Sequence, residues 1–143
     1  MSNKLPILLL AFNRPEHTKK VLDVIRGYQP DYLMVSIDGP REGNSDDKQL
    51  CHDVKEIIDS TDWAQSIIKH YSDVNLGCPV AVSQAITAFF ERFEEGIILE
   101  DDIVPSLDFF KFCEEMLETH RDNEEIMAIT GVNFQSSESG YPY

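Results

Sequence analysis

The chain has 143 residues, of which 42% are hydrophobic and 10% aromatic, a length and composition that fit one domain with a buried core. Twelve Lys and Arg residues against 26 Asp and Glu residues give a net charge of −14, which disfavours nucleic acid and anionic membrane surfaces as partners. The three cysteines are odd in number and widely spaced, so we expect no zinc or redox pattern and a reducing compartment. No targeting segment is visible in the sequence, from which we expect a cytoplasmic location. No apolar stretch is long enough to cross a bilayer, so we expect no transmembrane segment.

Apolar runs alternate with polar turns along the chain and predict strands and helices in alternation. Strands are expected at 7–12, 32–37, 66–71, 96–99 and 126–132, where apolar residues cluster, and the first of these is a continuous apolar run. Helices are expected after Pro15, after Ser45 as a cap, after Pro79 and after Pro105, each with an apolar stripe. This order predicts an α/β fold, with a doubly wound, mostly parallel sheet and helices on both faces. The tail at 135–143 is expected to be a loop at the end of a single domain covering 1–143.

The fourth strand ends in three consecutive acids, Glu100, Asp101 and Asp102. Adjacent carboxylates repel one another, and a bound cation would remove that cost. Mg²⁺ and Mn²⁺ prefer oxygen ligands and keep positions free for waters and phosphates. The triplet is therefore a candidate metal–diphosphate site, and a solvated acidic turn is the alternative interpretation.

Polar residues also follow the first two strands, as Asn13-Arg14 and Asp38-Gly39. In an open parallel sheet, ligands bind at the carboxyl ends of the strands, so these residues are expected to share one edge with the acidic triplet. Asp38 could accept hydrogen bonds from a base or ribose, and Arg14 could offer a planar fork to a base or phosphate. Together the three strand ends predict a site for a nucleotide diphosphate.

Other polar residues receive no functional role. The four histidines are scattered and are interpreted as surface or satisfied polar residues. Asp46 and Asp47 are interpreted as acids at the start of a helix. Asp108 and the Glu114-Glu115 pair are interpreted as solvated acids on a helix.

Three segments resemble a known family: 6–14 (PILLLAFNR), 35–39 (VSIDG) and 98–110 (ILEDDIVPSLDFF). In their order and spacing they are similar to the amino-terminal, donor-binding part of GT-A glycosyltransferases, closest to the N-acetylglucosaminyltransferase I type. The similarity extends to about Phe134, and the acidic triplet followed by Pro105 is its most specific part. The resemblance implies a Rossmann-like GT-A nucleotide-diphospho-sugar transferase fold that is incomplete at its carboxyl end.

The resemblance also implies roles for residues at the strand ends. Asn13, Arg14 and Asp38 resemble positions that bind the nucleotide of the donor, at its uridine end. Glu100 and Asp101 resemble residues that touch the ribose or the donor sugar.

Asp102, the last acid of a motif similar to Asp-x-Asp, resembles the ligand of Mn²⁺, for which Mg²⁺ is the alternative. The segment with Asn75 and Gly77, before the helix at Pro79, resembles a loop that closes around the diphosphate and sugar. Backbone amides at that helix start could add anion contacts.

The implied activity is transfer of a sugar from a nucleotide diphosphate sugar, expected to be a UDP-sugar, to the hydroxyl of a glycan or other acceptor. The metal would stabilise the departing diphosphate, and the carboxylate base of inverting members is not assigned to any residue of this chain. The alternatives are a non-catalytic nucleotide-sugar binding module or a truncated fragment without activity. A sugar-phosphate nucleotidyltransferase is disfavoured because no Gly-rich phosphate loop follows the first strand. An exposed sheet edge would favour a homo-oligomer.

Overall fold

The computed structural model describes residues 4–131, and its centre is a sheet of four parallel strands. The strands are β1 (Ile7–Ala11), β2 (Tyr32–Ile37), β3 (Ser66–Tyr71) and β4 (Ile97–Glu100), in the order β3-β2-β1-β4. Each lies where the sequence predicts a strand, because runs of apolar residues are suited to a parallel sheet covered on both faces. The structure thus confirms an α/β fold with a parallel sheet.

The register of the sheet brings the ends of three strands to the same level. Ala11 at the end of β1 pairs with Ile37 at the end of β2, and Leu10 pairs with Glu100 at the end of β4. We call this side of the sheet, with residues 12–14, 38–39 and 100–102, the carboxyl edge.

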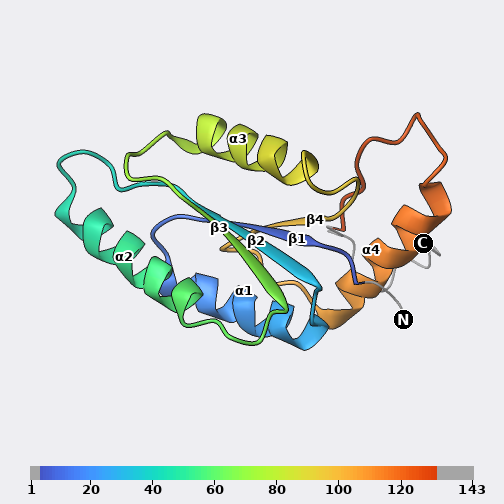
Figure 1. Cartoon of the computed structure of the whole chain (residues 1–143), viewed down its shortest axis with the longest axis horizontal. Coiled ribbons are helices and arrows are strands. Elements are labelled where there is room, and N and C mark those ends of the chain that lie inside the picture. The colour runs from blue at the N-terminus through green and yellow to red at the C-terminus, as the bar shows by residue number, and fades with distance from the viewer. Residues whose placement is uncertain (1–3, 132–143) are drawn as a thin grey trace, which may run out of the picture. The chain divides into compact units, whose positions relative to one another are not determined.

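Helices α1 (Pro15–Tyr28) and α2 (Ser45–Asp59) lie on one face of the sheet and α3 (Cys78–Phe90) lies on the other, as Figure 1 shows. Proline occupies the first turn of α1 and α3, where a missing N–H costs nothing. The cap of α2 differs from the prediction: Asn44, not Ser45, accepts hydrogen bonds from the backbone N–H groups of Asp46 and Asp47, each at 3.1 Å. No helix within residues 4–131 is long and apolar enough to cross a membrane.

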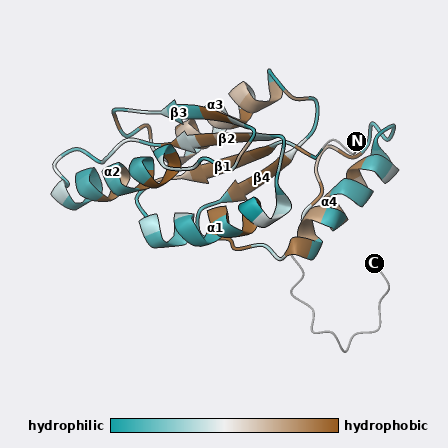
Figure 2. Ribbon diagram, turned by 60° about the horizontal axis from the view of Figure 1, so that its bottom comes forward, coloured by the Kyte–Doolittle hydropathy of each residue, from teal (hydrophilic) through white to brown (hydrophobic). Residues whose placement is uncertain are grey.

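The core fills both sides of the sheet, because successive strand residues point to opposite faces. On one side, Leu8 and Met34 pack with Ala85 and Phe89 of α3, and all four are buried. The other side carries buried strand residues and the apolar stripes of α1 and α2. Figure 2 shows the result, with hydrophobic strands inside and hydrophilic outer faces on α1 and α2. The residues buried on this second side include Ile7, Leu9, Leu33, Val35, Val21, Ile25, Val54 and Ile58.

The chain divides into two compact units, one ending at Leu107 and the other beginning at Asp108. Helix α4 (Leu107–His120) begins at this division. The strand expected at 126–132 is wrong for residues 126–131, which form neither strand nor helix. Met127 is 99% exposed, and no strand among residues 4–131 pairs with the segment to satisfy its backbone, which a strand needs. The tail predicted at 135–143 lies outside the described residues.

Candidate functional site

The residues predicted from the three strand ends all lie on the carboxyl edge of the sheet. β1 lies between β2 and β4, and all three run in the same direction. The backbone N–H of Asp38 donates to the carbonyl of Ala11 over 3.3 Å, which holds the ends of β1 and β2 together. The predicted grouping of these residues on one edge is therefore confirmed.

Arg14 connects the end of β1 to the acids after β4. Its Nη1 donates to Oδ2 of Asp102 over 2.6 Å and to Oδ1 of Asp101 over 3.3 Å. Arg14 and Asp102 remain accessible, with 50% and 41% of their side chains exposed. One guanidinium thus offsets part of the repulsion between two adjacent carboxylates.

Asp101 helps to hold the carboxyl edge together, a role that its position in the sequence does not reveal. It is only 5% exposed, and its Oδ2 accepts the backbone N–H of Phe12 over 3.1 Å. Burial raises the pKa of the Asp101 carboxyl, while the Phe12 N–H and the charge of Arg14 act in the opposite direction. Both carboxylate oxygens therefore join β4 to β1, whereas Glu100, the last residue of β4, is exposed.

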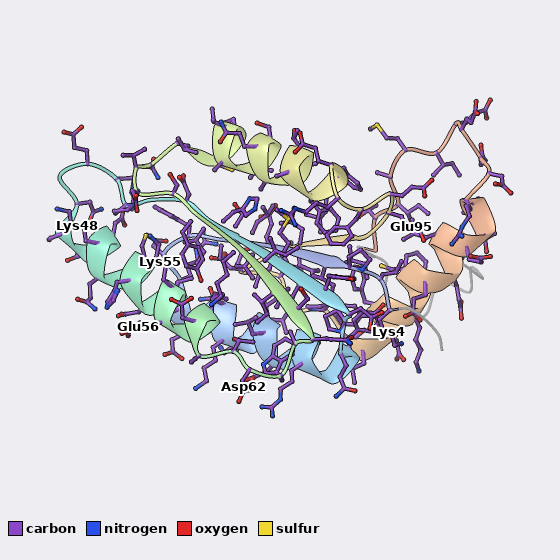
Figure 3. All side chains as sticks on the ribbon, viewed as in Figure 1. Lys4, Lys48, Lys55, Glu56, Asp62 and Glu95 are labelled. Carbon is purple, nitrogen blue, oxygen red and sulfur yellow. The ribbon has the colours of Figure 1, made fainter. Side chains whose placement is uncertain are left out.

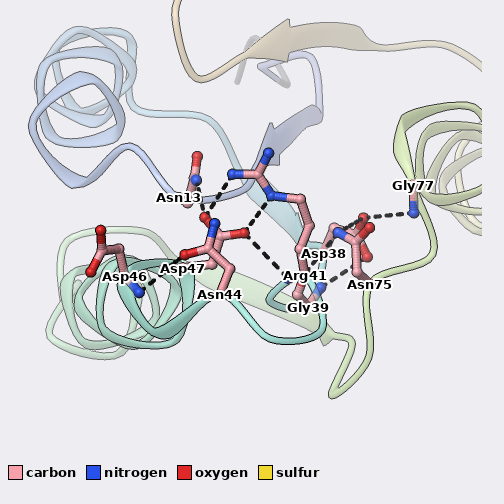
Figure 4. A network of polar contacts seen from close by, with 9 residues as sticks. All are labelled: Asn13, Asp38, Gly39, Arg41, Asn44, Asp46, Asp47, Asn75 and Gly77. Atoms are coloured by element: carbon pink, nitrogen blue, oxygen red, sulfur yellow. Dashed lines mark hydrogen bonds and ion pairs between the residues drawn. The ribbon is translucent and has the colours of Figure 1, made fainter.

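Asp38 organises the loop at 75–77, which the sequence also assigned to the site. Its Oδ1 accepts the backbone N–H groups of Gly39 at 2.8 Å and Leu76 at 2.9 Å. Its Oδ2 accepts the N–H of Gly77 at 3.1 Å and Nδ2 of Asn75 at 3.0 Å. Asp38, Asn75 and Gly77 are therefore brought together, with the carboxylate between them (Figure 4).

Gly39 allows this loop to approach the end of β2. A Cβ atom at Gly39 would lie 2.4 Å from the carbonyl carbon of Val74 and 2.5 Å from its oxygen. These are backbone atoms, so only a shift of the chain could make room for a side chain. The Asp-Gly pair, which in sequence looks like a turn signal, is here required by close packing.

A second network on the same edge, centred on Asp47, was missed by the sequence reasoning. Asp47 lies in the first turn of α2 as expected, but it is 1% exposed. Its carboxylate accepts Nε and Nη2 of Arg41, at 2.5 and 2.9 Å, and Nδ2 of Asn13 at 2.8 Å (Figure 4). The guanidinium of Arg41 also lies over the ring of Phe12, 5.7 Å from its centroid.

The hydrogen bonds from Arg41 hold the pKa of the Asp47 carboxyl well below its usual range, although burial acts in the opposite direction. The only signal in the sequence was the position of Asp47 in a first helical turn. That position does not reveal that an arginine six residues earlier folds back onto it.

A hollow of about 540 Å³ opens beside Asp38, between α3 and the strands β2 and β3. Polar side chains of Ser36, His70 and Gln84 line it together with Ala81 and Ala85 of α3. Its volume lies in the range of small-molecule sites, and the hollow is open to solvent. His70, which the sequence left without a role, is therefore close to the candidate site.

Asp102 keeps 41% of its side chain exposed, and its Oδ2 already accepts Nη1 of Arg14 over 2.6 Å, so a cation bound there would have to share this carboxylate with the guanidinium. Within residues 4–131, no group of three or more His, Cys, Asp or Glu side chains is gathered in a way that could hold a metal. Mg²⁺ and Mn²⁺ are commonly held by one or two carboxylates together with substrate phosphates and waters. The described residues therefore contain no closed cage of protein ligands for such an ion.

No protein-family model, no curated protein and no solved structure matches the chain.

Proposed function

We propose that the chain is the donor-binding part of a metal-dependent glycosyltransferase of the GT-A fold, with a UDP-sugar as the donor. The observation that carries this proposal is the presence of Arg14, Asp38 and Asp102 on one edge of a parallel sheet. Ligands of open parallel sheets bind at this edge. The proposed product is a glycoside of an acceptor hydroxyl.

In the proposed complex, the nucleotide lies along the carboxyl edge near Asp38, and its diphosphate lies toward Asp102. Asp102 would hold Mn²⁺ or Mg²⁺, and the ion would stabilise negative charge on the diphosphate. Arg14 would orient the nucleotide, with Asp101 as the buried group that positions its guanidinium. The 75–77 loop would cover the ligand from the side of α3. A cytoplasmic location is proposed with it, since the three free cysteines suit a reducing compartment.

The test is isothermal titration of the chain with UDP, with and without Mn²⁺, on the natural sequence and on Asp102→Ala. We expect binding that requires Mn²⁺ and that is lost in the variant, while the thermal unfolding temperature changes little. Asp62→Ala is the matched control, because it removes the same charge from an exposed position between α2 and β3 (Figure 3). Asp62→Ala should bind UDP like the natural sequence.

Absence of UDP binding in the folded chain would contradict the proposal. Equal Mn²⁺-dependent binding by Asp102→Ala would contradict the assignment of the metal ligand. A non-catalytic nucleotide-sugar binding module would share the donor site, so the release of UDP from UDP-sugars has to be measured as well. Binding without any release would favour the module over the enzyme.

A further inference from the structure

The loop after β2 supplies a second arginine close to the carboxyl edge, and two residues, Asp47 and Phe12, hold its side chain. Asp47 binds Nε and Nη2 of the Arg41 guanidinium. The same carboxylate accepts the backbone N–H of Arg41 at 3.2 Å. The ring of Phe12 lies under one face of the guanidinium. A long side chain that normally loses considerable rotamer entropy on binding is thus already ordered.

One edge of this guanidinium is left available. Within residues 4–131, Nη1 of Arg41 has no hydrogen-bond partner, and 58% of the side chain is exposed. Figure 4 shows this nitrogen pointing away from Asp47 and Asn44. Nη1 carries two N–H donors, so the protein presents a fixed pair of donors to whatever lies on this side.

The Asp47 carboxylate is 1% exposed and has lost its water, whereas 58% of the Arg41 side chain is exposed. The hydrogen bonds from Arg41 compensate the buried carboxylate, and they also fix the direction of the Arg41 side chain. Asp47 also binds Asn13, the neighbour of Arg14, so it ties Arg41 to the edge where the candidate site lies.

The local charge favours an uncharged acceptor for Arg41. The Asp47 carboxylate cancels the charge of the guanidinium, and Asp38, Asp101 and Asp102 lie on the same edge. A phosphate would gain little attraction from a neutralised arginine in an acidic surrounding. A carbonyl oxygen, in contrast, can accept hydrogen bonds from a group whose charge is already neutralised. A planar base can also lie alongside a planar guanidinium.

We propose that Arg41 is a specificity-determining residue that donates from Nη1 to a carbonyl oxygen of the nucleobase, and that Asp47 is its positioning residue. The proposal rests on the proposed function, since it names a contact of the donor nucleotide. It assigns recognition of the base to an arginine that is separate from Arg14. A base without a carbonyl at the contacted position would bind more weakly.

The experiment compares two simple probes, uridine and inorganic pyrophosphate, titrated in EDTA and followed by amide chemical shifts. The variants are Arg41→Gln, which removes the guanidinium, and Arg41→Lys, which keeps a cation for Asp47 but lacks the second donor edge. Arg26→Gln is the control, because Arg26 is exposed in the last turn of α1. We expect both Arg41 variants to bind uridine about tenfold more weakly, as for one lost hydrogen bond from a charged group, with pyrophosphate unaffected.

The proposal is overturned if Arg41→Lys binds uridine like the natural sequence, or if the variants lose affinity for pyrophosphate instead. It is also overturned if the natural sequence does not bind uridine. The proposed function is tested separately by the Mn²⁺ dependence of UDP binding in Asp102→Ala. Uridine binding that depends on Arg41, without Mn²⁺-dependent UDP binding, would support this inference and contradict the proposed function.

Discussion

Replacing Asp38 by asparagine separates two roles that a strand-end acid can have, ligand contact and support of the fold. The two oxygens of Asp38 accept four hydrogen bonds, two each, from three backbone N–H groups and the Asn75 amide. Asparagine has the same shape but offers one oxygen and one NH₂ group. Whichever way the amide turns, two of the four donors face another donor.

The expected cost follows from these contacts. A hydrogen bond to a charged group contributes about 1.5–3 kcal/mol, and two of them are lost. Because Asp38 is half-buried and the 75–77 loop can move toward water, we expect a cost below the full sum of about 3–6 kcal/mol, namely about 2–3 kcal/mol. If the free energy of unfolding falls with urea as steeply as in other small proteins, the urea concentration at the midpoint of unfolding should fall by about 1 M or more.

The assay is equilibrium unfolding in urea of Asp38→Asn, Asn75→Ala and the double variant, with Asp62→Asn as the control. Asn75 also donates to the carbonyl of Gly39 at 2.9 Å, so its loss alone should cost about 1 kcal/mol. The double variant should show a coupling energy of about 1 kcal/mol, because the two residues share a hydrogen bond. Unchanged stability of Asp38→Asn, or strictly additive effects, would refute the view that Asp38 holds the loop.

Three further variants test the packing and electrostatics of the first unit. Gly39→Ala should lower the free energy of unfolding by about 2–3 kcal/mol in urea, because its Cβ would overlap backbone atoms of Val74; a cost below 0.5 kcal/mol would contradict that geometry. Phe89→Ala should cost about 3–5 kcal/mol in the same assay, since this fully buried ring packs on Leu8 and Met34; a much smaller value would mean that α3 collapses onto the sheet. Asp47→Asn should destabilise the protein at neutral pH, and its deficit should shrink below about pH 4 in unfolding curves taken from pH 2 to 7. The sign follows from the pKa of Asp47: it is lowered on folding, so its stabilisation is complete above the ordinary value of 3.8 and is lost as the pH falls toward the folded value. A deficit that is independent of pH would show that the carboxylate charge is not what Arg41 binds.

The sequence predicts β1 and β2 well because most residues of their apolar runs are buried on both faces of the sheet. Such runs need only their own composition to be recognised, as at Ile7–Ala11. The segment at 126–131 is equally apolar, but a strand also needs a neighbour with free backbone groups. Sequence alone does not say whether that neighbour is present.

The candidate site was predictable as a set of strand ends and unpredictable in its details. Acids after a strand indicate an edge where ligands collect, which located Asp38 and Asp102. Whether a carboxylate is open to a ligand depends on which donors the fold brings to it. Asp38 and Asp101 meet donors of the protein itself, and Asp47 meets Arg41 through a turn that no periodic pattern reveals.

The central place of β1 also sets the order in which the edge can be completed. The contact between Asp38 and Asn75 spans 37 positions and that between Asn13 and Asp47 spans 34, whereas Arg14 and Asp101 are 87 positions apart. Closing a longer loop costs more chain entropy, although the increase with length is slow. A chain emerging from the ribosome can therefore join β1, β2 and β3 first. The partners of Arg14, which follow β4, are synthesised later. The contacts of Arg14 with Asp101 and Asp102 can form only after the chain has been made as far as β4 and the residues that follow it.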